Sequence, residues 1–159
     1  MRHTISVLVE NKPGVLARVS GLFSSRGFNI ESLTVGETED TTVSRMTIVV
    51  SGDDIILEQI TKQLNKLIDT IKVLDLTEKS FINRELALIR VTAKSNQRAE
   101  MMQIIDVFRA KIVDISPETF TVEVTGSEDK VNALINLLKP YGIKEMVRTG
   151  TVAISRATK

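Results

Sequence analysis

The order in which hydrophobic patterns follow one another is the feature that most constrains how this chain can fold. Apolar and polar residues alternate, as in strands, at about 2–10, 29–38, 42–51 and 71–76. Two amphipathic stretches with helical spacing lie between these strands. The first carries Val15, Leu16, Val19, Leu22 and Phe23, and the second carries Leu57, Ile60, Leu64 and Leu67. The first half of the chain is therefore predicted to have the order βαββαβ.

The same order returns in the second half. Strand patterns are expected at about 84–93, 111–115, 119–125 and 143–155, with two amphipathic helices among them. Their apolar faces hold Met101, Ile104, Ile105 and Phe108, and then Val131, Leu134, Ile135 and Leu138. Right-handed crossovers place both helices of such a unit on one face of a four-stranded antiparallel sheet. We predict an α+β protein of two tandem ferredoxin-like domains, 1–78 and 84–159, joined by a linker at 79–83.

The other face of each predicted sheet has no helix to cover it. Some apolar residues fall out of phase with the core and so point to this face: Leu8, Val49 and Leu74 in the first half, and Leu86 and Leu88 in the second. Apolar residues on an uncovered face or edge need a partner, and another copy of the chain is the simplest one. The pattern predicts a homodimer or a higher oligomer.

Composition excludes several classes of function. Lys and Arg total 21 against 20 for Asp and Glu, a net charge of +1, so no nucleic-acid partner is expected. The chain has no cysteine and a single histidine, His3, so thiol nucleophiles, cysteine zinc sites and multi-histidine metal cages are absent. It has no signal-like start and no apolar stretch of about 18 residues. We expect a cytoplasmic protein with no membrane partner, no bound metal and no catalytic residue.

One loop suggests a ligand. Asn11-Lys12-Pro13-Gly14 joins the first strand to the first helix, and the N–H groups of Gly14, Val15 and Leu16 are donors without helical acceptors. Such donors can bind a carboxylate, and Gly14 has no Cβ to block its approach. The Asn11 amide can accept from an ammonium group as well as donate. These features together suit a free amino acid, although a simple Pro-Gly turn capped by Asn11 would use the same residues.

A companion feature lies after the first helix, in Gly27-Phe28-Asn29-Ile30. Asn29 begins the second strand and could present its amide across a dimer interface. Ile30, with Val15 and Leu16, would make the cavity small and aliphatic, which selects only weakly among branched side chains. The alternative interpretation is that Asn29 is an ordinary turn residue after a helix-ending glycine.

These residues also carry a specific resemblance. Residues 9–19, Leu22-Phe23 and Gly27-Phe28-Asn29-Ile30-Glu31-Ser32-Leu33 resemble the ACT domain of the small regulatory subunit of acetolactate synthase. In the second half, residues 108–115, Gly142-Ile143, Arg148-Thr149-Gly150 and Arg156 resemble the C-terminal domain of that subunit. The resemblance covers essentially the whole chain.

The resemblance implies a regulatory subunit in branched-chain amino acid biosynthesis, without catalytic activity of its own. Such a subunit binds the large catalytic subunit, activates it and confers feedback inhibition by valine. The thiamine diphosphate, Mg²⁺ and FAD belong to the large subunit, so this chain is expected to bind no cofactor. The effector lies at the interface of paired ACT domains, at positions that match Asn11, Gly14, Val15, Leu16, Asn29 and Ile30 here.

Three other functions compete with this interpretation. An amino-acid-sensing ACT module could regulate a different metabolic enzyme. An RNA-recognition module shares the βαββαβ order, and Arg26-Gly27-Phe28 resembles the start of its RNP1 motif, but the further stacking aromatics are missing. An enzyme would need a constellation of groups, whereas His3, Glu10, Lys12 and Glu31 are isolated candidates and no phosphate-binding motif is present. We interpret His3 as a residue of the first strand.

Overall fold

The computed structural model describes residues 1–157 and divides the chain into two compact units. One unit holds Met1–Ile82 together with the residues from Thr151 on, and the other holds Asn83–Gly150. The sequence instead placed everything from 84 on in the second domain, and those domain boundaries stay a prediction. In the structure, the last residues group with the first unit.

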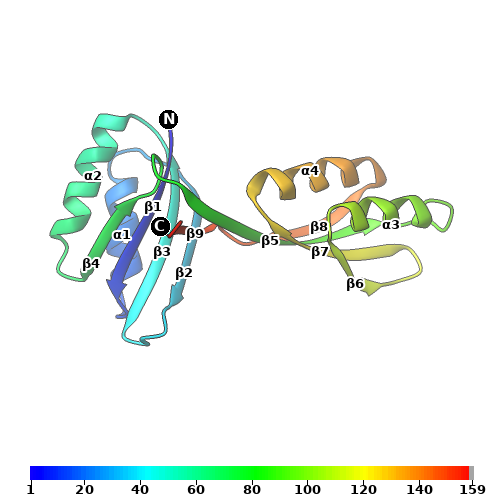
Figure 1. The fold of residues 1–159 in the computed structure, drawn as a ribbon, viewed down its shortest axis with the longest axis horizontal. Helices are drawn as coiled ribbons and strands as arrows, with labels where there is room; N and C mark the ends of the chain where they lie inside the picture. Colours follow the sequence, from blue (N-terminus) through cyan, green and yellow to red (C-terminus); the bar gives the residue numbers. More distant parts are fainter. Residues whose placement is uncertain (158–159) are drawn as a thin grey trace. The chain divides into compact units, whose positions relative to one another are not determined.

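The first unit has the predicted order of elements. They are β1 (Arg2–Glu10), α1 (Val15–Ser24), β2 (Ile30–Glu37), β3 (Val43–Ser51), α2 (Asp54–Lys66) and β4 (Thr70–Asp75). The strands form one antiparallel sheet in the order β2-β3-β1-β4, and both helices lie on one face of it (Figure 1). This is the ferredoxin-like arrangement, so the predicted fold class is confirmed for this unit.

Strand β1 is central because it pairs with β3 on one side and β4 on the other. Its register sets Val7 opposite Met46 of β3 and Val73 of β4. These residues face the helices, and each helix adds one apolar stripe to the core. The buried stripe residues are Val15, Val19 and Phe23 of α1, and Leu57, Ile60 and Leu64 of α2.

Helix α2 begins and ends for local reasons. Asp53 is its N-cap, and its Oδ1 accepts from Ile55 N at 2.8 Å and from Ile56 N at 3.4 Å. The helix ends at Lys66, because Leu67 has an extended backbone with ψ of 135°. The sequence placed Leu67 on the helical stripe. It lies just beyond the helix, half-buried, and still packs against the same core.

The second unit repeats the arrangement. Its elements are β5 (Phe81–Thr92), α3 (Arg98–Val107), β6 (Lys111–Ile115), β7 (Thr119–Gly126), α4 (Glu128–Leu138), the 3₁₀ helix η1 (Lys139–Tyr141) and β8 (Ile143–Arg148). The strand order β6-β7-β5-β8 corresponds to that of the first sheet, which confirms the second ferredoxin-like fold. Its core is separate and centres on Ile89, Val122 and Leu134. Strand β5 begins at Phe81, inside the segment that the sequence assigned to a linker.

The Arg148-Thr149 segment has a structural role in this unit. Arg148 Nε donates to Glu85 Oε1 at 2.8 Å, and Arg148 Nη2 donates to Asn132 Oδ1 at 2.7 Å. Glu85 is only 6% exposed, so the guanidinium compensates a carboxylate removed from water. Leu86 N donates to Thr149 Oγ1 at 2.9 Å. The motif therefore fixes the end of β8 to β5 and α4.

The last strand, β9 (Val152–Ser155), belongs to the first unit. Thr151 N donates to Ser32 Oγ at 2.8 Å, and Arg156 N donates to Ser80 O at 2.9 Å. The face of the first sheet without helices is less exposed than the sequence suggested, since Val49 is 2% exposed and Leu8 and Leu74 are half-buried. In the second unit Leu86 is half-buried and Leu88 is 39% exposed.

The four α-helices described here have 10 to 13 residues. Within residues 1–157 there is no helix with the length and apolar character that crossing a bilayer requires.

Two glycines of the first unit give a matched test of its packing. A Cβ on Gly52 would lie 1.7 Å from Phe28 Cε1, inside the core, whereas a Cβ on Gly21 would meet nothing within 4 Å. We expect Gly52→Ala to lower the free energy of unfolding by about 1–3 kcal/mol through overpacking. Gly21→Ala lies in α1 and should raise it by up to about 1 kcal/mol. Urea unfolding followed by circular dichroism measures both, and equal effects would contradict the placement of Phe28.

Candidate functional site

The loop between β1 and α1 is held by the Asn11 side chain. Asn11 Nδ2 donates to Glu37 Oε1 at 3.1 Å and to Thr41 O at 2.9 Å, and Asn11 N donates to Thr42 O at 2.8 Å. Both Nδ2 hydrogens are therefore used within the β2–β3 hairpin, which fixes the orientation of the amide. Asn11 Oδ1 has no donor among residues 1–157 and remains an acceptor that can bind a cationic group.

Helix α1 opens on a glycine with unusual geometry. Gly14 is the N-cap, with φ of 84° and ψ of −10°, a left-handed conformation that disfavours a side chain. No side chain caps the helix, and its first turn has no acidic residue. Val15 N has a long contact of 3.5 Å to Lys12 O, and Gly14 N and Leu16 N have no acceptor among the described residues. The start of α1 therefore keeps the donors that a carboxylate requires.

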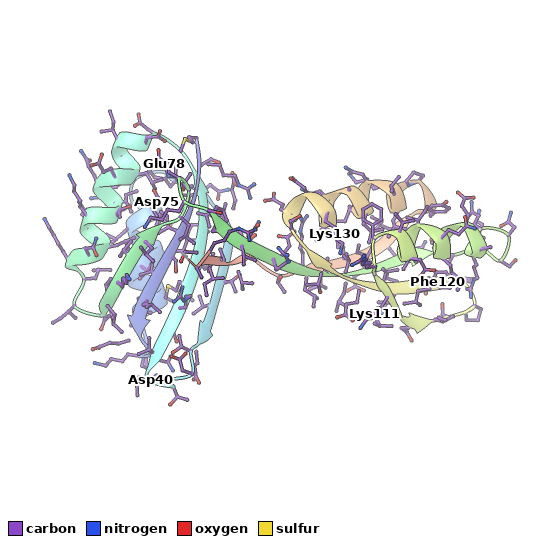
Figure 2. All side chains as sticks on the ribbon, in the orientation of Figure 1. Asp40, Asp75, Glu78, Lys111, Phe120 and Lys130 are labelled. Atoms are coloured by element: carbon purple, nitrogen blue, oxygen red, sulfur yellow. The ribbon has the colours of Figure 1, made fainter. Side chains whose placement is uncertain are left out.

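The predicted lining residues differ in what they expose. Val15 as a whole residue is 3% exposed and belongs to the core, so its side chain does not line the loop. Leu16 is 44% exposed and can contact a ligand with its side chain. Asn11 also lines a pocket of about 450 Å³, together with Glu10, Lys12, Ile71 and residues 41–43 of the hairpin. Figure 2 shows Asp40 at the tip of this hairpin.

The two charges of this pocket neutralise each other. Lys12 Nζ lies 2.8 Å from Glu10 Oε2, and this hydrogen bond is the main reason that the pKa of Lys12 is raised. Both side chains are largely exposed, so the pair contributes little to stability. Its consequence is that the pocket beside Asn11 carries no net charge from these two residues.

A second ion pair holds the first turn of α1. Arg18 donates to Asp69 Oδ2 through Nε at 3.0 Å and through Nη2 at 2.7 Å. Asp69 also accepts from Glu10 N at 2.8 Å through its backbone carbonyl. The segment between α2 and β4 thus braces both the end of β1 and the start of α1.

Asn29 and Ile30 lie at the opposite end of the same sheet. Glu10, next to Asn11, pairs with Val43, whereas Ile30 pairs with Val50. These two positions of β3 are seven steps apart along the strand, which corresponds to about 24 Å at the usual rise of a strand. Asn29 is exposed and Ile30 is half-buried. One chain therefore brings Asn11, Gly14, Val15 and Leu16 together but does not bring Asn29 and Ile30 to them.

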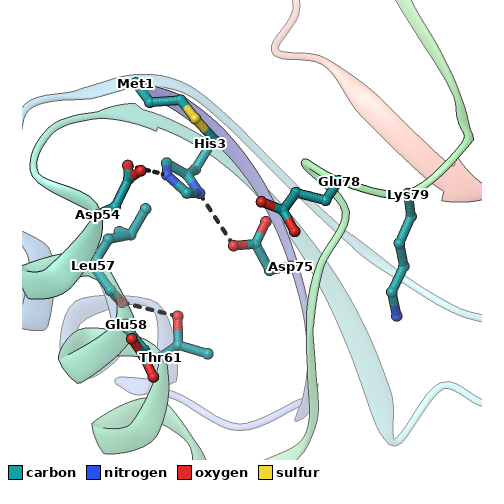
Figure 3. A pocket seen from close by; sticks show the side chains of 9 residues that line it. All are labelled: Met1, His3, Asp54, Leu57, Glu58, Thr61, Asp75, Glu78 and Lys79. Atoms are coloured by element: carbon teal, nitrogen blue, oxygen red, sulfur yellow. Dashed lines mark hydrogen bonds and ion pairs between the residues drawn. The ribbon is translucent and has the colours of Figure 1, made fainter.

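His3 lies between two carboxylates, beside a pocket of about 370 Å³ (Figure 3). Its Nε2 is 2.8 Å from Asp54 Oδ1, and its Nδ1 is 3.1 Å from Asp75 Oδ2. The residue is only 7% exposed. The neighbouring Thr77 hydroxyl accepts from Thr4 N and donates to Asp75 Oδ1, so it is hydrogen-bonded within the fold.

The environment of Asp75 favours its charged form. Burial by itself would raise the pKa of this carboxyl group, but hydrogen bonds from Thr77 and His3 outweigh burial and lower the pKa. His3 and Asp75 thus connect α2, β1 and the end of β4 through charge-assisted hydrogen bonds. Among residues 1–157 no three His, Cys, Asp or Glu side chains are arranged so that they could hold a metal ion.

Sequence reasoning found the loop but missed the residues that support it. Arg18 could have been found, because it lies four residues after Gly14 and hence on the same side of the helix. Asp69 gave no local signal, since its partner Arg18 is 51 residues away. Phe28, the aromatic residue of the RNP1-like sequence, is 9% exposed and packs in the core, so it is not available to stack on an RNA base.

Comparison with known proteins covers both halves of the chain. Residues 5–72 match the family described as the AHAS small subunit-like ACT domain, and residues 84–157 match the family described as the small subunit of acetolactate synthase. A probable acetolactate synthase small subunit of Archaeoglobus fulgidus is 63% identical over 159 residues, 100% of this chain and 99% of the relative. The acetolactate synthase small subunit of Aquifex aeolicus is 58% identical over 156 residues, 98% of this chain and 81% of the relative.

A solved structure has the same fold throughout. The crystal structure of the acetolactate synthase small subunit from Thermotoga maritima matches with a TM-score of 0.90 and 44% identity. The match covers 100% of this chain and 99% of that chain. The likeness therefore extends over both units.

The lowered pKa of Asp75 predicts an acid-dependent contribution to stability. This contribution is present above the ordinary aspartate pKa of about 3.9 and is lost as the pH falls through the lower pKa of the folded state. We expect Asp75→Asn to destabilise the protein near pH 7. Between about pH 7 and pH 3 the variant should lose less stability than the unmodified chain. Urea unfolding at both pH values measures this, with the exposed Glu58→Gln as control. Equal losses for Asp75→Asn and the unmodified chain would contradict it.

Proposed function

Because this chain belongs to the family of acetolactate synthase small subunits, which are regulatory and not catalytic, we propose that it makes a catalytic large subunit responsive to valine. In this proposal the chain binds the large subunit, raises its activity and transmits feedback inhibition. It acts in the cytoplasm, and the thiamine diphosphate, Mg²⁺ and FAD are bound by the large subunit. Family membership supports the regulatory role, and the proposal adds valine as the ligand and feedback inhibition as the mechanism.

The observation that carries the proposal is the pairing of two complementary groups at one loop. The start of α1 offers N–H donors at Gly14 and Leu16 that have no acceptor among the described residues, and Asn11 offers Oδ1 as an acceptor. A free amino acid carries a carboxylate and an ammonium group on one carbon, so it can bind both at once. Leu16, with its exposed side chain, supplies an apolar contact for an aliphatic side chain.

The same geometry explains why a second copy is needed. Strand β2 is at the edge of its sheet, and within the first unit it pairs only with β3. Glu37, which binds Asn11, ends β2, and Asn29 directly precedes its start. Two copies that align their β2 edges antiparallel would bring the end of one strand beside the start of the other. The Asn11 loop of one copy would then face Asn29 and Ile30 of its partner.

A ligand bound between two copies can regulate through its own binding free energy. Valine shifts an equilibrium only if it binds one arrangement of the subunits more tightly than another. A site that two chains build together meets this requirement, because the ligand contacts both chains only in the arrangement that forms the site. The bias then reaches the catalytic partner through the position of the paired regulatory chains.

Gly14 provides the most direct test of the anion site. We expect Gly14→Asp to weaken valine binding about tenfold or more, because a carboxylate at the start of α1 repels that of the ligand. Gly14→Asn is the matched control, since Asn has the same shape, lacks the charge and also tolerates a left-handed backbone. The Cβ of either side chain would meet only the guanidinium of Arg18, with Nη1 at 3.0 Å. Calorimetry with valine, and inhibition assays with the large subunit, provide the measurements.

Activation of the large subunit should persist in both variants, because the substitution lies at the effector loop. If Gly14→Asp bound valine as tightly as Gly14→Asn, the loop would not be the anion site.

Mixing two inactive variants tests whether the site is shared. Gly14→Asp damages the loop, and Asn29→Lys damages the partner's side by adding a cation near the ligand's ammonium group. Each variant alone should bind valine about tenfold or more weakly than the unmodified chain. In a mixed dimer, the intact loop of one chain meets the intact Asn29 of the other, so random exchange should restore about a quarter of the sites. Calorimetry of the mixture counts them, and no recovery at all would indicate a site within one chain.

A further inference from the structure

Arg18 lies directly over the glycine that opens α1. A Cβ placed on Gly14 would be 3.0 Å from Arg18 Nη1 and 3.8 Å from Cζ. The guanidinium reaches this position because Arg18 follows Gly14 by one helical turn and Arg18 N donates to Gly14 O at 3.1 Å. The side chain is 49% exposed, so a ligand at the loop can reach it.

Only one side of this guanidinium is occupied. Nε and Nη2 both donate to Asp69 Oδ2, whereas Nη1, the nitrogen nearest Gly14, donates to no acceptor in the described part of the chain. Asp69 is fixed, since its side chain is 10% exposed and its carbonyl accepts from Glu10 N. Arg18 is therefore held in place by one edge and presents its remaining donors toward the start of the helix.

We infer that Arg18 is a further effector-binding residue, which donates from Nη1 to the carboxylate of the amino acid held at Gly14. This inference rests on the proposed function, because it names one more contact of the same site. Asp69 then has two effects: it orients Arg18, and its negative charge limits how strongly the pair attracts an anion. The structure thus assigns to Arg18 and Asp69 control over the strength of carboxylate binding.

The alternative is that Arg18 and Asp69 only brace the loop. Bracing and direct binding predict different results. If the pair only braces, removing either partner loosens the loop and weakens every ligand to a similar extent. If Arg18 binds the carboxylate, removing Arg18 lowers the affinity only for ligands that carry a carboxylate. Removing the charge on Asp69 then raises the affinity for these same ligands.

The experiment compares valine with valinamide, whose carboxamide has no charge, by calorimetry on the full chain. We expect Arg18→Gln to lower the affinity for valine about tenfold and the affinity for valinamide less than about twofold. Asp69→Asn should raise the affinity for valine about threefold or more and leave the affinity for valinamide unchanged. The matched control is Arg90→Gln, which removes the same charge from a solvent-exposed ion pair with Glu145 in the second unit.

Folding defects do not obscure the result, because the ratio of the two affinities does not depend on the fraction of folded protein. The double variant Arg18→Gln/Asp69→Asn leaves no buried carboxylate without its cation. It should show the same ratio of valine affinity to valinamide affinity as Arg18→Gln. An unchanged ratio in Arg18→Gln, with valine still bound by the unmodified chain, would overturn the role of Arg18 and leave the proposed function standing. No binding of valine by the unmodified chain would overturn both.

Discussion

The donors at the start of α1 are the interaction on which the candidate site depends. A helix leaves its first N–H groups without internal acceptors, and most helices satisfy them with a capping side chain. Here the N-cap is Gly14, which supplies no side chain, and the first turn has no acidic residue. By contrast, α2 in the same unit is capped by Asp53. The fold therefore leaves one of its two helix starts available for a ligand.

The remaining contacts around the loop keep this start in position. Asn11 fixes it to the hairpin, Arg18 fixes it to Asp69, and the central strand β1 leads into it. The edge position of β2 adds a second constraint, because the backbone groups along a sheet edge can pair with another strand. In the proposed function the effector site and the dimer interface are therefore connected, since Asn11 of the proposed effector loop contacts Glu37 at the end of the edge strand β2.

The sequence predicted the fold well because the core depends on local periodicity. Ile5, Val7 and Val9 alternate in β1 and all lie in the core, and the helical stripes of α1 and α2 face them. Gly14 and Asn11 could also be singled out from their neighbours. Asp69 could not, because its role arises only when the fold brings it to Arg18. Nor could the destination of residues 151–157, since the contact from Thr151 to Ser32 spans 119 positions and leaves no periodic pattern.

The second unit has the same fold but a different helix start at the position that corresponds to Gly14. Its corresponding helix start has Gln97 as N-cap and is followed by Arg98. Arg98 Nε donates to Ala93 O at 2.9 Å, Nη2 donates to Ser116 O, and the guanidinium lies 4.8 Å from the centre of the Phe120 ring. These contacts direct the cation into its own unit, whereas Arg18 Nη1, beside Gly14, has no acceptor among residues 1–157. The proposed effector site therefore depends on the residues at the helix start, Gly14 and Arg18, and not on the ferredoxin-like fold by itself.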